Sequence, residues 1–85
     1  MPVVLRYQGY KFFFYSNEGN PLEPPHIHVR LAGKEAKFRL VPDVSVGRND
    51  GFDARTIRLL HEIVTVNRNF LEDEWHGYFT CKNLV

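Results

Sequence analysis

The chain has 85 residues, of which 44% are hydrophobic and 25% charged, and its formal net charge is +1. This composition is typical of one small globular domain over residues 1–85, and it excludes a disordered chain. The single cysteine excludes an internal disulfide framework, and no apolar run approaches the length that spans a membrane. The N-terminus lacks the charged-then-apolar plan of a signal peptide, so we expect a cytoplasmic protein.

Two strands are predicted at the start of the chain, over residues 3–7 and 10–16, joined by the two-residue turn Gln8-Gly9. Pairing outward from this turn gives four opposed pairs: Leu5 with Phe12, Val3 with Phe14, Val4 with Phe13, and Arg6 with Lys11. The first two pairs are apolar and share one face of the predicted hairpin. The other two pairs share the opposite face.

A second hairpin is predicted around the run Glu23-Pro24-Pro25-His26-Ile27-His28-Val29-Arg30-Leu31. The prolines favour an extended start, and the apolar and polar residues that follow alternate with the period of a strand. The turn Ala32-Gly33 leads into a return strand over residues 34–40. Pairing outward from it opposes Val29 to Ala36, Ile27 to Phe38, Arg30 to Glu35, His28 to Lys37, and His26 to Arg39. One face is again apolar, and the other carries the histidines.

The C-terminal half is predicted to hold one long helix from about Asp53 to His76, after a turn-rich stretch that leaves a short fifth strand at residues 44–46 as an option. Asp53 is a suitable N-cap, Phe52 can staple to Ile57, and Gly77 is a natural stop. The apolar residues that recur on one half of this helix are Ile57, Leu59, Leu60, Ile63, Val64, Val66, Phe70, Leu71 and Trp75. We therefore expect an α+β fold, in which a four-stranded antiparallel meander packs against one long C-terminal helix, followed by a short tail over residues 78–85.

His26 and His28 are the candidates for chemistry, because residues two apart on a strand point to the same face. They could share a zinc or another borderline metal, with a further ligand from His61, His76, Cys81, Glu23 or Glu35. They could instead serve as acid and base in phosphodiester cleavage, with Lys37 or Arg39 stabilising the transition state. A third interpretation is that both histidines only bond the backbone near the prolines. The sequence leaves open whether the protein is an enzyme, and it predicts no cofactor apart from the optional divalent metal.

The polar face of the predicted sheet combines cations with aromatic residues. Its members are Arg6, Lys11, Phe13, Tyr15, His26, His28, Arg30, Lys37 and Arg39. Aromatic rings among cations suit the stacked bases and phosphates of RNA, and the same composition suits a protein interface. Because no second helix is predicted that could cover Phe13 and Tyr15, we expect a protein partner or self-association through this face, with RNA as the other partner that the face suits. Coverage of these two rings by the loop over residues 17–25 is the remaining alternative.

Several runs of the sequence are similar to one family of small bacterial proteins. The runs are GYKFFFYSNEG at residues 9–19, EPPHIHV at 23–29, AKF at 36–38, GFDAR at 51–55 and WHGYF at 75–79. They resemble domain-of-unknown-function family 4160, and EPPHIHV contains the most specific part of the resemblance. Many members of that family carry an Asp-His pair just before the prolines, whereas this chain has Glu23, so the resemblance provides no third histidine for a metal.

The resemblance implies a stand-alone bacterial protein that acts in a two-gene, toxin–antitoxin-like module. It implies a partner but no particular reaction and no catalytic residues. Our hypothesis is therefore a binding component of such a module that uses the polar sheet face. A histidine-dependent ribonuclease and a metal-binding domain, both built on His26 and His28, are the alternatives.

Overall fold

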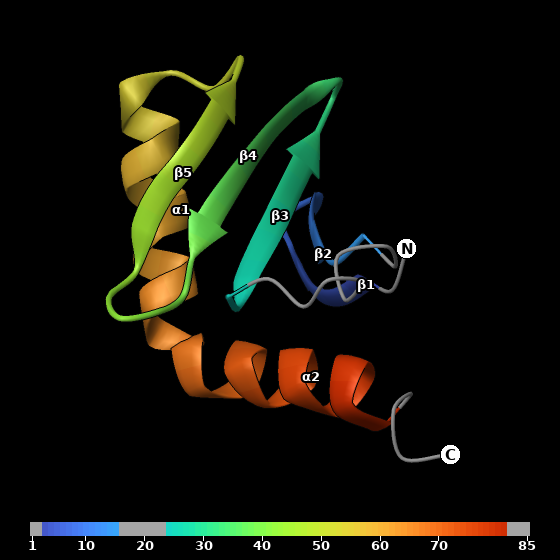
Figure 1. Ribbon diagram of the computed structural model, residues 1–85. Helices are drawn as coiled ribbons and strands as arrows, with labels where there is room; N and C mark the ends of the chain where they lie inside the picture. The colour runs from blue at the N-terminus through green and yellow to red at the C-terminus, as the bar shows by residue number, and fades with distance from the viewer. Residues whose placement is uncertain (1–2, 16–23, 82–85) are drawn as a thin grey trace.

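The computed structural model describes residues 3–15 and 24–81, which form a five-stranded antiparallel sheet and two helices (Figure 1). The elements are β1 (Val3–Tyr7), β2 (Tyr10–Phe13), β3 (His26–Leu31), β4 (Lys34–Arg39), β5 (Ser45–Asp50), α1 (Ala54–Val66) and α2 (Arg68–Cys81). The strands neighbour one another in chain order, so the sheet is a meander. The predicted α+β fold is thus confirmed, whereas the numbers of strands and helices differ from the prediction.

Both predicted hairpin turns are present, and their backbone angles explain the register. Gln8 and Gly9 have φ angles of 46° and 87°, and Ala32 and Gly33 have φ angles of 51° and 80°. Positive φ at both central residues is the conformation of a two-residue turn whose twist matches that of the flanking strands. In the β3–β4 hairpin, every pair predicted from the turn is observed, including those of His26 with Arg39 and His28 with Lys37.

The β1–β2 hairpin departs from prediction at its open end. Its register shifts between Val3 and Leu5, so Val3 lies opposite Phe13 rather than Phe14, and the predicted pairing of Val4 with Phe13 is wrong. An extra residue in one strand of this kind is a β-bulge. The predicted pairs nearer the turn, Leu5 with Phe12 and Arg6 with Lys11, are observed.

The fifth strand is longer than the option at residues 44–46, because all of Ser45–Asp50 belongs to β5. It pairs with β4 through a second register shift between Lys37 and Phe38. Gly47 lies at this shift, and a Cβ atom there would stand 3.4 Å from the carbonyl oxygen of Lys37. The polar, turn-forming residues of this segment therefore form an exposed edge strand rather than a loop.

The prediction of one long helix is wrong, because the helix bends at Asn67 (Figure 1). The backbone N–H and the side-chain amide of Asn67 both donate to the carbonyl oxygen of Ile63, at 3.1 and 2.8 Å. The φ and ψ angles of Asn67 are −99° and 12°. One turn earlier, the Thr65 hydroxyl donates to the His61 carbonyl at 2.7 Å. Side-chain donors that bond the carbonyls of a helix in this way are a known cause of bends. The predicted stop at Gly77 is also wrong, since α2 continues through it to Cys81.

The core lies between the sheet and the two helices. Its buried residues are Phe12, Phe14, Ile27, Val29, Ala36, Phe38, Leu40, Phe52, Leu60, Val64, Leu71, Trp75 and Phe79. Of the predicted helix stripe, Leu59, Val66 and Phe70 are instead 38%, 83% and 44% exposed. Leu59 and Val66 lie within α1 and point well away from the narrower stripe that Leu60 and Val64 bury. Phe70 lies beyond the bend, where the stripe drawn along a straight helix does not continue.

The N-terminus of α1 forms as predicted, since the Asp53 side chain accepts a hydrogen bond from the Thr56 N–H at 2.8 Å. Hydrogen bonds from the side chain and then the backbone of Thr56 lower the pKa of the Asp53 carboxyl group. Neither α1 nor α2 combines the length and the apolar character that crossing a membrane requires.

Candidate functional site

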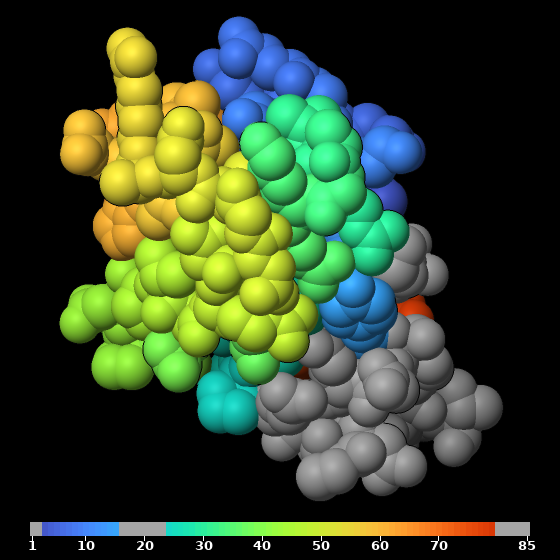
Figure 2. All heavy atoms as spheres, turned by 90° about the horizontal axis from the view of Figure 1, so that it is seen from above, coloured from blue at the N-terminus to red at the C-terminus, as the bar shows by residue number. Residues whose placement is uncertain are grey.

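Cross-strand pairing arranges the polar side chains in rows on the face of the sheet opposite the core, which we call the open face. One row crosses all five strands and contains Arg6, Lys11, Arg30, Glu35 and Asp50. The next row contains Phe13, His28, Lys37 and Arg48, and a third contains His26 and Arg39. Seen from above, the atoms of β4 (green) and β5 (yellow-green) lie against one another at the surface (Figure 2).

A partly buried carboxylate organises one part of the open face. The Tyr15 hydroxyl donates to Glu35 at 2.9 Å, and the Arg30 guanidinium donates to the same carboxylate at 3.1 Å. Arg48 Nη2 and His28 Nδ1 each lie 3.6 Å from Glu35 Oε2, and the Glu35 side chain is only 15% exposed. We call these five residues the Glu35 network.

The network changes the acidity of two of its members. Burial, together with the hydrogen bond to Glu35, raises the pKa of the Tyr15 hydroxyl. The hydrogen bond to Glu35 also raises the pKa of the Arg30 guanidinium, which therefore stays charged. The network thus consists of a carboxylate that several donors share, and it favours the protonated phenol of Tyr15.

His28 is enclosed by rings rather than presented to solvent. It is 3% exposed, it stacks on Phe13 with ring centres 5.5 Å apart, and it forms a T-shaped contact with Tyr15 with ring centres 4.6 Å apart. The Arg30 guanidinium lies 5.2 Å from the centre of the Phe13 ring, which is itself 1% exposed. The expectation that Phe13 and Tyr15 are left uncovered on this face is therefore wrong for Phe13, which is buried, while Tyr15 is half-buried. Residues 17–23 of the loop that was the alternative cover lie outside the described residues.

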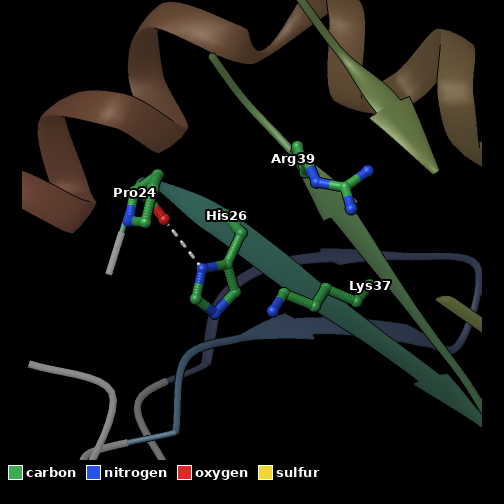
Figure 3. A pocket seen from close by; sticks show the side chains of 4 residues that line it. All are labelled: Pro24, His26, Lys37 and Arg39. Carbon is green, nitrogen blue, oxygen red and sulfur yellow. Dashed lines mark hydrogen bonds between the residues drawn. The ribbon is translucent and has the colours of Figure 1, made fainter. Parts of the chain in front are cut away.

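A small pocket of about 80 Å³ opens beside His26, and the described residues that line it are Pro24, His26, Lys37 and Arg39 (Figure 3). The His26 Nδ1 atom lies 2.9 Å from the Pro24 carbonyl oxygen. Because a carbonyl oxygen only accepts hydrogen bonds, Nδ1 must carry a proton and donate it. The His26 ring also packs 4.7 Å from the Trp75 ring of α2 and 5.1 Å from the His28 ring. The imidazole is therefore held in one orientation at the pocket.

Of the four candidates for chemistry, the structure brings His26, Lys37 and Arg39 together at the pocket and leaves His28 in the Glu35 network. The other members of the predicted binding face are distributed by exposure. Arg6, Lys11 and Arg39 are exposed, Tyr15, Arg30 and Lys37 are half-buried, and Phe13, His26 and His28 are buried. The cations of the predicted face thus reach the surface, whereas its histidines do not.

Of the predicted third metal ligands in the part of the chain that the structure describes, Glu35 is the one that lies near a histidine, with its Oε2 3.6 Å from His28 Nδ1. Over residues 3–15 and 24–81, no group of three or more His, Cys, Asp or Glu residues is placed to hold a metal ion. His61 Nε2 instead lies 3.0 Å from the Val44 carbonyl oxygen, and His76 is exposed on α2. Glu23 and the side chain of Cys81 lie outside the described residues.

Sequence reasoning missed three contributors to these sites: Glu35 as the centre of a network, Arg48, and the Pro24 carbonyl. The predicted Arg30–Glu35 pair was a usable signal for Glu35, because a carboxylate among several cations attracts more than one of them. Arg48 could be placed on the open face only after all of residues 45–50 were assigned to a strand. No pattern in the sequence indicates that a backbone carbonyl orients His26.

The fold and these sites define a class of small α+β protein, in which helices cover one face of a meander sheet and charged side chains gather on the other. Within that class, the family model for a domain of unknown function, DUF4160, matches residues 9–76. The match covers most of the chain, so the protein belongs to this family, as the resemblance predicted. Comparisons with curated proteins and with solved structures find no match.

Proposed function

We propose that this protein is a bacterial, cytoplasmic binding component of a two-gene, toxin–antitoxin-like module, and that it binds an acidic partner macromolecule through its open face. The observation that carries this proposal is the row arrangement of cations across the sheet. Arg6, Lys11 and Arg30 are successive cross-strand partners, and Lys37 pairs with Arg48 in the next row. Like charges directly opposite each other destabilise a fold. Their presence here therefore favours a role in binding a partner over a role in stability.

The carboxylates of this face compensate only some of its cations. Glu35 lies against Arg30 and Arg48, and Asp50 accepts from Arg48 Nε at 2.9 Å. Within the described part of the chain, Arg6, Lys11 and Arg39 form no ion pair with a carboxylate. A surface with a local excess of one charge accelerates and orients the binding of an oppositely charged partner.

A histidine-dependent ribonuclease is the alternative function, and it receives less support. Acid–base cleavage requires both imidazoles to reach one phosphodiester, within hydrogen-bond distance. His26 lines the pocket, but His28 is enclosed by Phe13 and Tyr15. A metal-binding domain receives less support for a similar reason, because a closed site needs more protein ligands than two imidazoles.

Self-association stays a prediction, but the open face no longer provides a structural reason for it. The prediction was based on Phe13 and Tyr15 having no cover, but Phe13 is buried and Tyr15 is half-buried within a single chain. Binding through the open face therefore depends on charge rather than on aromatic area.

Co-purification from the native host, followed by mass spectrometry and nucleic-acid analysis, tests the proposal. We expect a stoichiometric acidic partner that dissociates as the salt concentration rises. The double variant Lys11→Glu/Arg39→Glu should reduce its recovery about tenfold or more, since two favourable contacts become repulsive.

The matched control is Arg55→Glu/Arg58→Glu, which makes the same change in charge at two exposed positions of α1. It should retain the partner. Equal recovery with both double variants, or the absence of any acidic partner, would contradict the proposed function.

A further inference from the structure

The size of the His26 pocket limits what it can hold. Its volume of about 80 Å³ has room for several water molecules, each of which needs roughly 10–15 Å³ of such space. A space of this size suits a single tetrahedral oxyanion better than a nucleobase or a large side chain. The ligand of the pocket is therefore a small group that belongs to a larger molecule, or a free ion.

The chemistry of the lining selects for an anion. Lys37 and Arg39 extend from β4 on the side of the sheet that carries His26 (Figure 3). A guanidinium provides a planar fork of donors and an ammonium provides a compact charge, and both are typical phosphate ligands. None of the described lining residues is acidic. The His26 ring, fixed by the Pro24 carbonyl and by Trp75, adds a third group that is already oriented.

The cations beyond the pocket favour a ligand with repeated charges over an isolated phosphate. Strands lie about 4.8 Å apart, so the distance from β4 to β1 is about 14 Å. Arg30, Lys11 and Arg6 occupy successive strands along this path. Even in a duplex, each nucleic-acid strand carries a phosphate about every 3.4 Å of the helix axis, so the path is long enough for more than one phosphate.

The buried rings indicate which feature of a nucleic acid the face contacts. Phe13 and His28 are not available as platforms for bases, so the described face offers charge rather than base stacking. A recessed pocket requires a backbone that can bend to insert one phosphate, which a single strand does more easily than a stiff duplex.

We propose that the pocket of Pro24, His26, Lys37 and Arg39 binds one phosphate group of single-stranded RNA, and that the neighbouring phosphates lie along Arg30, Lys11 and Arg6. This inference rests on the proposed function, because it specifies the chemistry of the acidic partner. It assigns Lys37 and Arg39 to phosphate binding and His26 to positioning that phosphate, with no cleavage of the strand.

Fluorescence anisotropy with a labelled oligouridylate of about ten nucleotides, within the usual range of single-strand site sizes, tests the proposal. The comparison is between Lys37→Gln/Arg39→Gln and the matched control Arg55→Gln/Arg58→Gln. We expect the pocket variant to bind at least about tenfold more weakly than the control. The slope of log affinity against log salt should fall in magnitude by about 0.7 for the one phosphate contact that is lost.

A second measurement keeps the test independent of RNA affinity. Inorganic phosphate, titrated into the wild-type protein, should cause a saturable NMR shift of the His26 ring protons. The ring of His61 is the internal control, because it contacts the Val44 carbonyl oxygen. The His26 shift should weaken in the Lys37→Gln/Arg39→Gln variant, whose thermal unfolding is followed to confirm that it is folded.

Three results would overturn the inference: equal affinity and slope for the pocket and control variants, equal phosphate shifts at His26 and His61, or equal competition by a polyglutamate peptide. The last result would assign the pocket to carboxylates of a protein. If any of these occurs while Lys11→Glu/Arg39→Glu still loses a co-purified acidic protein, the inference fails and the proposed function stands. If no acidic partner is recovered either, both fail.

Discussion

The Glu35 network and the His26 pocket occupy the same face of the sheet, and β3 contributes one histidine to each. In the network, the cations surround the Glu35 carboxylate, whose side chain is 15% exposed. Tyr15 and Arg30 both donate hydrogen bonds to it. At the pocket, the described lining combines two cations with an imidazole and includes no carboxylate. We expect the network centred on a carboxylate to contribute mainly to the stability of the fold, and the cationic pocket to contribute mainly to recognition. The following predictions test this division.

The largest effect is expected from Trp75→Ala, which removes the ring that supports the pocket from α2. Trp75 is 1% exposed and packs against Phe14, Phe79 and His26. Truncation of a buried tryptophan costs about 3–5 kcal/mol, and urea denaturation should show a loss of this size in the free energy of unfolding. Phe70→Ala, at a ring that is 44% exposed, is the control and should cost much less. Similar losses for the two variants would mean that α2 does not support the pocket.

A smaller loss is expected from Glu35→Gln, which removes the charge at the centre of the network. The Arg30 guanidinium and the Tyr15 hydroxyl would then share a neutral amide, and a hydrogen bond to a charged group is worth about 1.5–3 kcal/mol. Denaturation of this variant should be compared with that of Asp50→Asn, whose side chain is 60% exposed and paired with Arg48. The Asp50 variant should lose less than about 1 kcal/mol. If the network does not stabilise the fold, Glu35→Gln and Asp50→Asn should show the same small loss in the free energy of unfolding.

The network also predicts how stability depends on pH in alkaline solution. Because burial and Glu35 raise the pKa of Tyr15 in the folded protein, the unfolded chain loses its phenol proton first. The stabilisation is therefore complete below the unfolded pKa of about 10, and it is lost as the pH rises through the folded value. The free energy of unfolding should fall more steeply above about pH 10 in the wild type than in Tyr15→Phe. Tyr7→Phe, at a tyrosine that is 39% exposed on β1, should keep the wild-type slope.

The smallest effect on stability is expected at the pocket cations. Arg39 is exposed, and its guanidinium donates a 3.5 Å hydrogen bond to the Val46 carbonyl oxygen. Arg39→Gln should change the free energy of unfolding by no more than about 0.5 kcal/mol in thermal or chemical denaturation. A loss as large as that of Glu35→Gln would place Arg39 among the structural charges and remove the distinction between the two regions.

The sheet was largely predictable because turn chemistry and a period of two act locally. The positive φ angles of Ala32 and Gly33 define a two-residue loop, and such a loop leaves one register for β3 and β4. The bulge near Val3 was not predictable, because one extra residue disturbs the pairing without changing the pattern of apolar residues. The bend at Asn67 was missed for a similar reason. Its cause is the side-chain hydrogen bonding of Asn67 and Thr65, and no proline or glycine marks it.

The candidate site was only half predictable. Alternation places His26, His28, Lys37 and Arg39 on one face, and the observed register agrees. Alternation does not state how deeply a face is buried, so it could not separate the enclosed His28 from the His26 that lines a pocket. That separation depends on contacts between residues far apart in the chain, such as the ring of Trp75 against His26.

The order of the strands has a consequence for how the chain folds. Each strand of the meander pairs with its immediate neighbour in sequence, so the whole sheet can form through local hairpins. Contacts between near neighbours in sequence form quickly, because little loop entropy is lost in closing them. The packing of Trp75 on His26 is different, since β4, β5 and α1 all lie between these residues in the chain. We therefore expect the sheet to assemble before α2 docks, so that the His26 pocket is the last part of the molecule to acquire its shape and Trp75 fluorescence reports that final step.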